Sequence, residues 1–219
     1  MSHFPTFPSL PTLAEGTLRI AAFRGFAPFA WHDGTAARGR DIAFLRHFAE
    51  TNGLELVVDF HSFDRLWELP AQDTADIAAG GISLRRYIPV AWTQPYSEVR
   101  RTLLIRLEDA ERIRGMNDLG RLAVVPHSIA HTHAEETLAG HANLSFAPTL
   151  EHGIEDLLLG QIDALGTGSV SAEYHISRHP GLTLVDVHVD RAPEPISFAT
   201  RPELVLALDA FIASYGGLY

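Results

Sequence analysis

Residues 41–60 read DIAFLRHFAETNGLELVVDF, and this stretch decides the fold class. Its first half carries apolar side chains at the spacing of one helix face, namely Ile42, Phe44, Leu45 and Phe48. That periodicity predicts a helix over residues 41–52, which Asn52-Gly53 terminates. Residues 54–60 are rich in Leu, Val and Phe and predict a strand. A helix that leads directly into a strand is typical of a β-α-β unit.

The segments on either side of this stretch extend the alternation. TLRIAAF at 17–23 predicts a strand before it, a short helix is expected over 63–69, and ADIAAG at 75–80 predicts a third strand. Strand, helix, strand, helix and strand in this order predict a parallel sheet with right-handed crossovers. Residues 1–15 are interpreted as an irregular leader followed by a short helical piece.

The pattern begins again after a long alternating strand over 99–107. The expected strands of the second half are 122–125, 144–147, 164–165 and 182–187, and the expected helices are 129–138, 150–159 and 170–177. A final strand is expected over 195–200 and a final helix over 202–214. Two β-α-β patterns joined by one long strand predict an α/β protein of two lobes. Its ligand cleft is expected between the lobes, at the carboxyl ends of the strands.

The composition excludes several kinds of chemistry. The 219 residues include 17 basic and 27 acidic side chains, and the formal net charge of −10 argues against a nucleic-acid partner. All the basic residues are arginines, so Schiff-base and P-loop lysines are excluded. Cysteine is absent, which excludes thiol nucleophiles, disulfides and iron–sulfur clusters. With 46% hydrophobic and 20% charged residues, the chain is expected to be an ordinary globular protein.

Neither a membrane helix nor a signal peptide is expected from the sequence. No run approaches the ~18 apolar residues that a membrane helix needs. MSHFPTFPSLP at 1–11 lacks a basic start and an apolar run, and three prolines interrupt it. We therefore expect a periplasmic protein if a signal peptide has been removed, and a cytoplasmic one if Met1 is the native start.

Eight short motifs stand in one order over roughly residues 16–205. They are GTLRIA at 16–21, FAPF at 26–29, GRDIAF at 39–44, DIAAGGIS at 76–83, WTQPY at 92–96, DLGRLAV at 118–124, LGQIDA at 159–164 and RHPGL at 178–182. The ordered set resembles the type II periplasmic solute-binding proteins, of the amino-acid-binding kind (family 3) that serves ABC importers.

The resemblance implies two lobes, with residues 1–100 and 195–219 in lobe 1 and residues 101–194, including the hinge strands, in lobe 2. It also implies a monomer that grips a small carboxylate-bearing ligand, amino-acid-like or an organic acid, and delivers it to the membrane subunits of an ABC transporter. No cofactor, no metal and no catalytic residue are expected.

The resemblance assigns Arg86 to the ligand carboxylate, because the family carries an arginine eight residues before the position of Gln94. A guanidinium presents a planar fork that matches a carboxylate. The alternative is a solvated arginine at a helix end, and Arg85 beside it is open to the same interpretation.

Four further residues of the first half are candidates for ligand contact. The sequence GGIS at 80–83 follows an expected strand, and the N–H of Gly81 and the hydroxyl of Ser83 are expected to meet an anionic group. The alternative is a plain tight turn. The resemblance also places Phe26 and Phe63 beside the ligand side chain, against the alternative of core packing.

Candidates in the second half begin at His127-Ser128, which stands where the family has Gly-Thr-Thr at a helix N-terminus. The free N–H groups of such an end attract anions, Ser128 keeps the hydroxyl, and His127 fills or caps part of the cleft. Thr167 is a further polar side chain expected at the ligand. His131 and His133 follow without a cysteine, so they are interpreted as polar residues at a helix start rather than as metal ligands.

Gly168 marks a departure from the family pattern. Members that bind α-amino acids carry an Asp at about this position, which pairs with the ligand ammonium. Without that carboxylate an ammonium would be poorly compensated. The ligand is therefore expected to be a carboxylate without an amine, or a larger anion, rather than a standard α-amino acid.

The same fold has an enzyme branch, and GGIS at 80–83 with His179-Pro180 resembles the cyclohexadienyl (prephenate/arogenate) dehydratases. That branch has a catalytic Glu soon after the missing Asp, where this chain has Ser171, with Glu173 two residues on. Losing both acids argues against dehydration, which needs a proton donor. The rival hypothesis is a dehydratase-like lyase on a repurposed binding-protein fold in the cytoplasm, and the third is a sensor module. The candidate residues of the rival enzyme are His127, Arg86 and Glu173.

Overall fold

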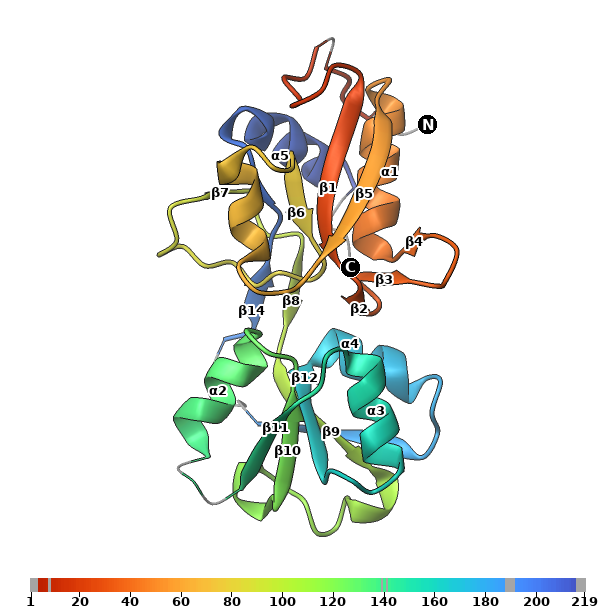
Figure 1. Cartoon of the computed structure of the whole chain (residues 1–219), viewed down its shortest axis with the longest axis vertical. Helices are drawn as coiled ribbons and strands as arrows, with labels where there is room; N and C mark the ends of the chain where they lie inside the picture. Colours follow the sequence, from red (N-terminus) through yellow and green to blue (C-terminus); the bar gives the residue numbers. More distant parts are fainter. Residues whose placement is uncertain (1–3, 8, 139, 141, 188–191, 216–219) are drawn as a thin grey trace. The chain divides into compact units, whose positions relative to one another are not determined.

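The computed structural model of the chain describes residues 4–7, 9–138, 140, 142–187 and 192–215. These residues form two compact units, each with its own five-stranded sheet (Figure 1). Unit 1 comprises Met1–Arg24, Phe29–Glu98 and Glu194–Tyr219, and unit 2 comprises Gly25–Pro28 and Val99–Pro193. None of the helices described in these ranges is long and apolar enough to cross a membrane.

The sheet of unit 1 is parallel at its centre and antiparallel at one edge. Its strand order is β5 (Glu55–His61), β1 (Thr17–Phe23), β6 (Ile77–Ala79), β15 (Ala199–Thr200) and β7 (Ala91–Trp92). β1 pairs in parallel with β5 and β6, while β15 pairs antiparallel with β6 and β7. The chain runs from β1 to β5 on one side and then back to β6 on the other. Right-handed crossovers therefore place α1 (Arg40–Thr51) and the 3₁₀ helix η1 (Leu66–Gln72) on opposite faces (Figure 1).

The core of unit 1 forms where α1 meets α5 (Val205–Ser214). The apolar face of α1 is fully buried, and Phe211 of α5 contacts both Phe44 and Phe48 edge to face, with ring centroids 5.3 and 5.2 Å apart. Each such phenylalanine contributes roughly 1.5–3 kcal/mol of burial free energy. The helical periodicity of residues 41–52 is thus used to cover one side of the sheet, and the predicted helix is confirmed.

The sheet of unit 2 has the same plan. Its order is β11 (Asn143–Phe146), β10 (Arg121–Val124), β12 (Ala164–Gly168), β9 (Arg101–Arg106) and β13 (Leu182–Asp186). β10 pairs in parallel with β11 and β12, and β9 pairs antiparallel with β12 and β13. The helices that connect or follow these strands are α2 (Ile129–Thr137), α3 (Leu150–Leu158) and α4 (Ser169–Ile176). Figure 1 shows α2 and α3 on opposite sides of the unit 2 strands, as the reversal of direction after β11 requires.

Short elements complete the fold. β8 (Ser97–Val99) pairs with β14 (Glu194–Ile196), and β2 (Gly25–Phe26), β3 (Ala30–His32) and β4 (Ala37–Arg38) form a small three-stranded sheet. The short 3₁₀ helices are η2 (Leu107–Asp109), η3 (Met116–Asp118) and η4 (Pro202–Leu204). β8 and β14 lie where the chain leaves unit 1 and returns to it.

Several element predictions need correction. The helix expected over 63–69 is a 3₁₀ helix that begins only at Leu66, because Arg65 takes a left-handed conformation with φ of 55°. The strand expected over 195–200 is two strands, since β14 pairs with β8 whereas β15 joins the main sheet. The long strand over 99–107 divides between β8 and β9. No helix forms in the described residues before 16, so the expected short helical piece is wrong there.

Candidate functional site

In unit 1, side chains gather at the carboxyl ends of three neighbouring parallel strands. Phe23 ends β1, Phe63 follows β5, and the turn that follows β6 leads to Arg85. The rings of Phe23 and Phe63 are 5.3 Å apart between centroids, and Phe63 meets Trp67 of η1 at 5.9 Å. The guanidinium carbon of Arg85 lies 3.7 Å from the centre of the Trp67 ring. We call Phe23, Phe63, Trp67 and Arg85 the strand-end cluster.

Arg85 is the charged member of the strand-end cluster and is only 9% exposed. Burial lowers its pKa, and Tyr87 and Glu194 act in the opposite direction. An arginine nevertheless keeps its proton in a protein. The contact with Trp67 is a cation–π interaction, which typically contributes about 0.5–2 kcal/mol.

Ser83 is tied to the strand that re-enters unit 1. It forms a β-bridge with Ile196, and the neighbouring Leu84 N–H donates to the carbonyl of Pro195 at 2.8 Å. The Ser83 hydroxyl lies 3.4 Å from a carboxylate oxygen of Glu194, which makes a weak hydrogen bond. The predicted ligand residue Ser83 therefore stands two residues before Arg85 in a segment held at both its backbone and its side chain.

The N–H of Gly81, expected to meet an anion of the ligand, meets an anion of the protein instead. The Asp41 Oδ2 accepts the N–H groups of Gly80 at 2.8 Å and Gly81 at 3.0 Å, and also the Tyr96 hydroxyl at 2.8 Å. Gly81 has φ of +69°, and a Cβ there would lie 2.6 Å from the Phe29 ring. A ligand at Gly81 would have to compete with this carboxylate.

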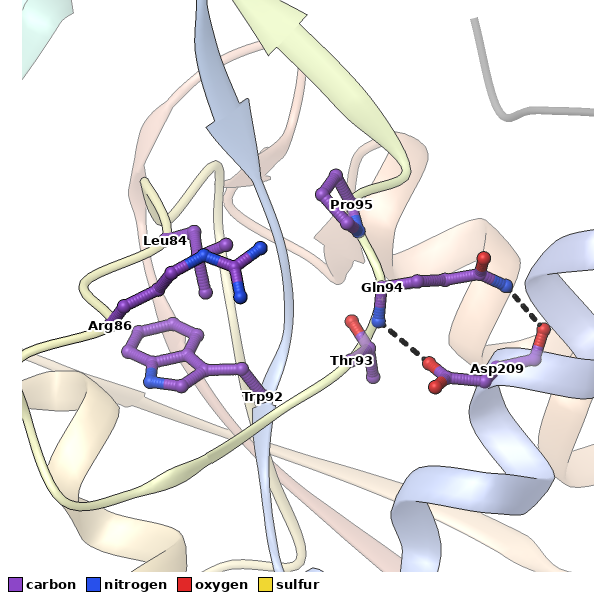
Figure 2. A pocket seen from close by; sticks show the side chains of 7 residues that line it. All are labelled: Leu84, Arg86, Trp92, Thr93, Gln94, Pro95 and Asp209. Carbon is purple, nitrogen blue, oxygen red and sulfur yellow. Dashed lines mark hydrogen bonds between the residues drawn. The ribbon is translucent and has the colours of Figure 1, made fainter.

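Arg86 does not follow Arg85 into the strand-end cluster. It is exposed and lines a separate pocket of about 490 Å³, whose lining residues are Leu84, Arg86, Trp92, Thr93, Gln94, Pro95 and Asp209 (Figure 2). On the far side of that pocket, Gln94 donates two hydrogen bonds to Asp209. The structure thus places the predicted carboxylate anchor at a different location from Ser83 and Phe63, and the sequence-based assignment missed Arg85 and Trp67.

The structure assigns the two predicted aromatic contacts to different units. Phe63 is 6% exposed within the strand-end cluster of unit 1. Phe26 lies on β2 in unit 2 and is half-buried.

In unit 2, Ser128 and Thr167 stand at the carboxyl ends of the parallel neighbours β10 and β12. Ser128 caps α2, since its Oγ accepts the His131 N–H at 3.2 Å. His127 has φ of 61°, is exposed, and donates its N–H to Nδ1 of His131 at 3.1 Å. Thr167 is 5% exposed, and its carbonyl accepts the hydroxyl of Thr102 at 3.4 Å. Ser128 and Thr167 therefore lie at the same end of the unit 2 sheet, whereas Phe26 of the same unit lies on β2 outside that sheet.

The surroundings of Gly168 include a buried guanidinium. A Cβ at Gly168 would lie 3.4 Å from a terminal nitrogen of Arg101 and 3.3 Å from Val99. Arg101 is 8% exposed on β9, opposite Gly168 in the ladder. Sequence reasoning missed this arginine, although its position in the alternating segment 99–107 placed it on one face of a strand.

The candidate acid of the rival enzyme is poorly placed for proton donation. The Glu173 side chain on α4 is 62% exposed and lies 3.9 Å from Arg100. Ser171, which the resemblance places where the enzyme branch has its acid, is 4% exposed. A general acid is favoured by a buried, uncompensated carboxyl, and Glu173 has neither property. Within the described part of the chain, no group of three or more His, Cys, Asp or Glu residues is arranged to hold a metal ion.

No family model matches the sequence. The chain is 26% identical over 208 residues to the cyclohexadienyl dehydratase of Pseudomonas aeruginosa, which covers 91% of this chain and 75% of that protein.

Solved structures agree with the observed architecture. An amino acid ABC transporter substrate-binding protein from Streptococcus pneumoniae, bound to L-arginine, matches with a TM-score of 0.82 at 26% identity, over 93% of this chain and 91% of that one. An ancestral amino-acid-binding protein described as a precursor of cyclohexadienyl dehydratase matches with a TM-score of 0.82 at 22% identity, over 92% and 90%. The chain has the type II periplasmic-binding-protein fold, the fold of amino-acid-binding proteins of ABC transporters and of the precursors of cyclohexadienyl dehydratase.

Proposed function

We propose that this chain is a solute-binding protein that captures a small carboxylate-bearing ligand at the strand-end cluster of unit 1. The observation that carries the proposal is the Arg85 guanidinium, whose central carbon lies over the Trp67 ring at the carboxyl edge of the parallel strands. This edge is where ligands bind in open α/β sheets. The similarity to substrate-binding proteins of amino acid ABC transporters supports the same function.

The cluster supplies two kinds of ligand contact. Trp67 covers one face of the Arg85 guanidinium, and a guanidinium can grip a carboxylate with two parallel hydrogen bonds along its edge. Phe63 and Phe23 add an aromatic wall for the body of the ligand. The contact with Trp67 restrains the arginine before a ligand arrives, which reduces the entropy lost on binding.

The ligand class is proposed to be acids without an α-ammonium, such as keto acids or dicarboxylates. An ammonium requires a nearby carboxylate, whereas the charged member of the strand-end cluster is the Arg85 guanidinium. A cation at this position disfavours an ammonium and favours an anion. The similar protein bound to L-arginine thus indicates the fold rather than the ligand of this chain.

The cellular role proposed here is delivery of the ligand to the membrane subunits of an ABC transporter, by a monomer in the periplasm. The similar Streptococcus pneumoniae protein is a substrate-binding protein of an amino acid ABC transporter, which supports delivery to such a transporter. A signal peptide encoded upstream of Met1 in the gene would strengthen this proposal. A gene whose reading frame starts at Met1 would weaken it.

Calorimetric titration tests the ligand class. The panel consists of keto acids, dicarboxylates and aromatic acids, with the matching α-amino acids alongside. We expect saturable binding of at least one acid that lacks an amine, with a rise in unfolding free energy of about 2.7 kcal/mol at 100 times the Kd. The Arg85→Gln variant should weaken binding by ~10-fold or more.

The matched control is Arg46→Gln, which removes one exposed guanidinium from α1 in the same unit. It should bind as the wild type does. Preference for ordinary α-amino acids, or unchanged affinity in the Arg85 variant, would contradict the proposal.

A second candidate function is a dehydratase-like lyase, and the 26% identity to cyclohexadienyl dehydratase over 91% of the chain favours it. Incubation with prephenate and arogenate, followed by detection of the aromatic product, tests it. The replacement of the family acid by Ser171 and the exposure of Glu173 lead us to expect no turnover above the uncatalysed rate. Turnover that Glu173→Gln abolishes would establish the enzyme in place of the binding protein.

A further inference from the structure

The pocket around Arg86 is a second place in unit 1 where charged and aromatic groups converge. It is formed by the loop after Ser83, by the edge strand β7 and by α5 (Figure 2). Its volume of about 490 Å³ lies within the range of about 300–1,000 Å³ that is typical of small-molecule sites. Arg85 and Arg86 are adjacent in sequence, yet Arg85 stacks on Trp67 whereas Arg86 lines this pocket with Trp92.

Arg86 brings an uncompensated positive charge to the pocket. Among the described residues it makes no hydrogen bond and no ion pair, and its side chain is exposed. In Figure 2 its guanidinium extends past the ring of Trp92 toward the side of the pocket that Gln94 forms. Trp92 is half-buried on β7 and offers an indole wall. A free guanidinium beside an aromatic wall fits a carboxylate attached to a flat ring.

The opposite wall is fixed by two hydrogen bonds. The Gln94 N–H donates to Asp209 Oδ1 at 2.7 Å, and its side-chain amide donates to the carbonyl of Asp209 at 2.6 Å. Pro95 follows directly and has no N–H to donate. Asp209 is held by its Oδ1 and keeps lone pairs for a donor on the ligand, such as a hydroxyl group.

We propose that the Arg86 pocket is a binding site for small aromatic carboxylates, separate from the site at the strand-end cluster. Arg86 holds the carboxylate, Trp92 packs against the ring, and Asp209 accepts a hydrogen bond from a distal hydroxyl. The site lies entirely within unit 1. It goes beyond the proposed function, since it predicts a second binding event that does not involve Arg85.

The test uses the full chain and 4-hydroxyphenylacetate as the probe, because this molecule carries the carboxylate, the ring and the hydroxyl. The indole N–H resonances of the three tryptophans report on different places: Trp67 on the strand-end cluster, Trp92 on the Arg86 pocket and Trp31 on β3. Phe substitutions assign them. We expect a saturable shift of the Trp92 resonance at millimolar concentrations, and a Kd at least ~10-fold higher for the neutral amide analogue.

Adjacent arginines provide matched variants. Arg86→Gln should raise the Kd at Trp92 at least ~10-fold, whereas Arg85→Gln should leave the Trp92 titration unchanged. Arg46→Gln, with the same loss of charge on α1, should also leave it unchanged.

Three outcomes would overturn the proposal: no saturable shift of Trp92, a shift with the same Kd in the Arg86 variant, or loss of the Trp67 and Trp92 responses together in that variant. The last outcome would make Arg86 part of the principal site. A Trp92 response that depends on Arg86, with Trp67 silent toward every acid, would support this pocket and refute the proposed function instead.

Discussion

Replacing Asp41 with asparagine should expose a pH dependence that the wild-type protein conceals. Asp41 is 1% exposed in the first turn of α1, and its Oδ2 accepts hydrogen bonds from Gly80, Gly81 and Tyr96. Its Oδ1 is buried without a hydrogen-bond partner among the described residues. Burial raises the pKa of Asp41 to about 6 from an ordinary value of 3.8, despite the hydrogen bonds, which act to lower it.

The raised pKa sets both the sign and the size of the effect. The folded chain holds this proton more tightly than the unfolded chain, so the contribution of Asp41 to stability is full below about pH 4 and is lost as the pH rises to about 6. A difference of about 2 in pKa corresponds to about 3 kcal/mol.

His175 has the opposite dependence over nearly the same window. It is 5% exposed on α4, and burial lowers its pKa to about 4 from 6.5, with smaller effects of His179 and Arg178. The unfolded chain therefore binds the proton more tightly, and stability rises by about 3 kcal/mol as the pH increases from about 4 to 6.5. The two contributions nearly cancel in the wild type between pH 4 and 6.

The Asp41→Asn variant removes the contribution of Asp41 to the pH dependence of stability and keeps that of His175. Asparagine retains an oxygen that can accept from Gly80, Gly81 and Tyr96, but it does not titrate. Relative to the wild type, the variant should lose about 3 kcal/mol of unfolding free energy when the pH is lowered from 6 to 4. His175→Gln should show the mirror image, with a relative gain of similar size over that interval.

Urea unfolding followed by circular dichroism at a series of pH values measures these differences. Asp41 lies in unit 1 and His175 in unit 2. If the two units unfold in separate transitions, each transition will show only the pH dependence of the group in its own unit. If the Asp41→Asn and wild-type curves stay parallel to within about 1 kcal/mol from pH 4 to 6, the reasoning from burial is refuted.

Two further predictions concern the backbone around the candidate site residues. Gly81→Ala should destabilise the protein by about 2–4 kcal/mol, because φ is +69° and the new Cβ would meet the Phe29 ring at 2.6 Å. Urea unfolding measures this difference, and a loss of unfolding free energy below about 1 kcal/mol would contradict the prediction. Ser128→Ala should lower the unfolding free energy by about 1 kcal/mol, because the His131 N–H loses the hydroxyl that caps it. Thermal unfolding measures this loss, with Ser145→Ala on the edge strand β11 as the control variant. Equal effects of the two variants would show that the cap contributes little.

The elements that the sequence predicts well are those with a local periodic signal. The helix expected over 41–52 is observed as Arg40–Thr51, and the strand expected over 17–23 is observed at those residues. In the helix, the spacing of apolar residues reports which face is buried, whereas the strand is a short apolar run that is buried on both faces over Ile20–Phe23. The expected range of 63–69 is wrong for the 3₁₀ helix, which lies at Leu66–Gln72. Its start depends on the left-handed backbone of Arg65, and no periodicity of the sequence indicates that conformation.

Contacts between distant segments were not predictable in the same way. Asp41 lies 39 residues from Gly80 and 55 from Tyr96, and the sequence motif around Asp41 says nothing about either partner. The edge position of Gly80-Gly81 was expected, but the carboxylate that occupies its N–H groups was not. A prediction that two segments meet at one edge of a sheet does not identify which polar side chain of one segment bonds to the backbone of the other.

The adjacent arginines show why a motif alone does not assign a ligand contact. Arg85 and Arg86 both follow the GGIS segment in a loop, where neighbouring side chains have no fixed angular relation. The resemblance favours Arg86 by counting residues, whereas packing against Trp67 brings Arg85 to the strand ends. The same limit applies at Gly168: the resemblance indicates only that an acid is missing, and the structure adds the buried Arg101, whose terminal nitrogen lies 3.4 Å from where a Cβ would stand. Counting residues along a motif does not report which charged side chain of the paired strand stands opposite that position.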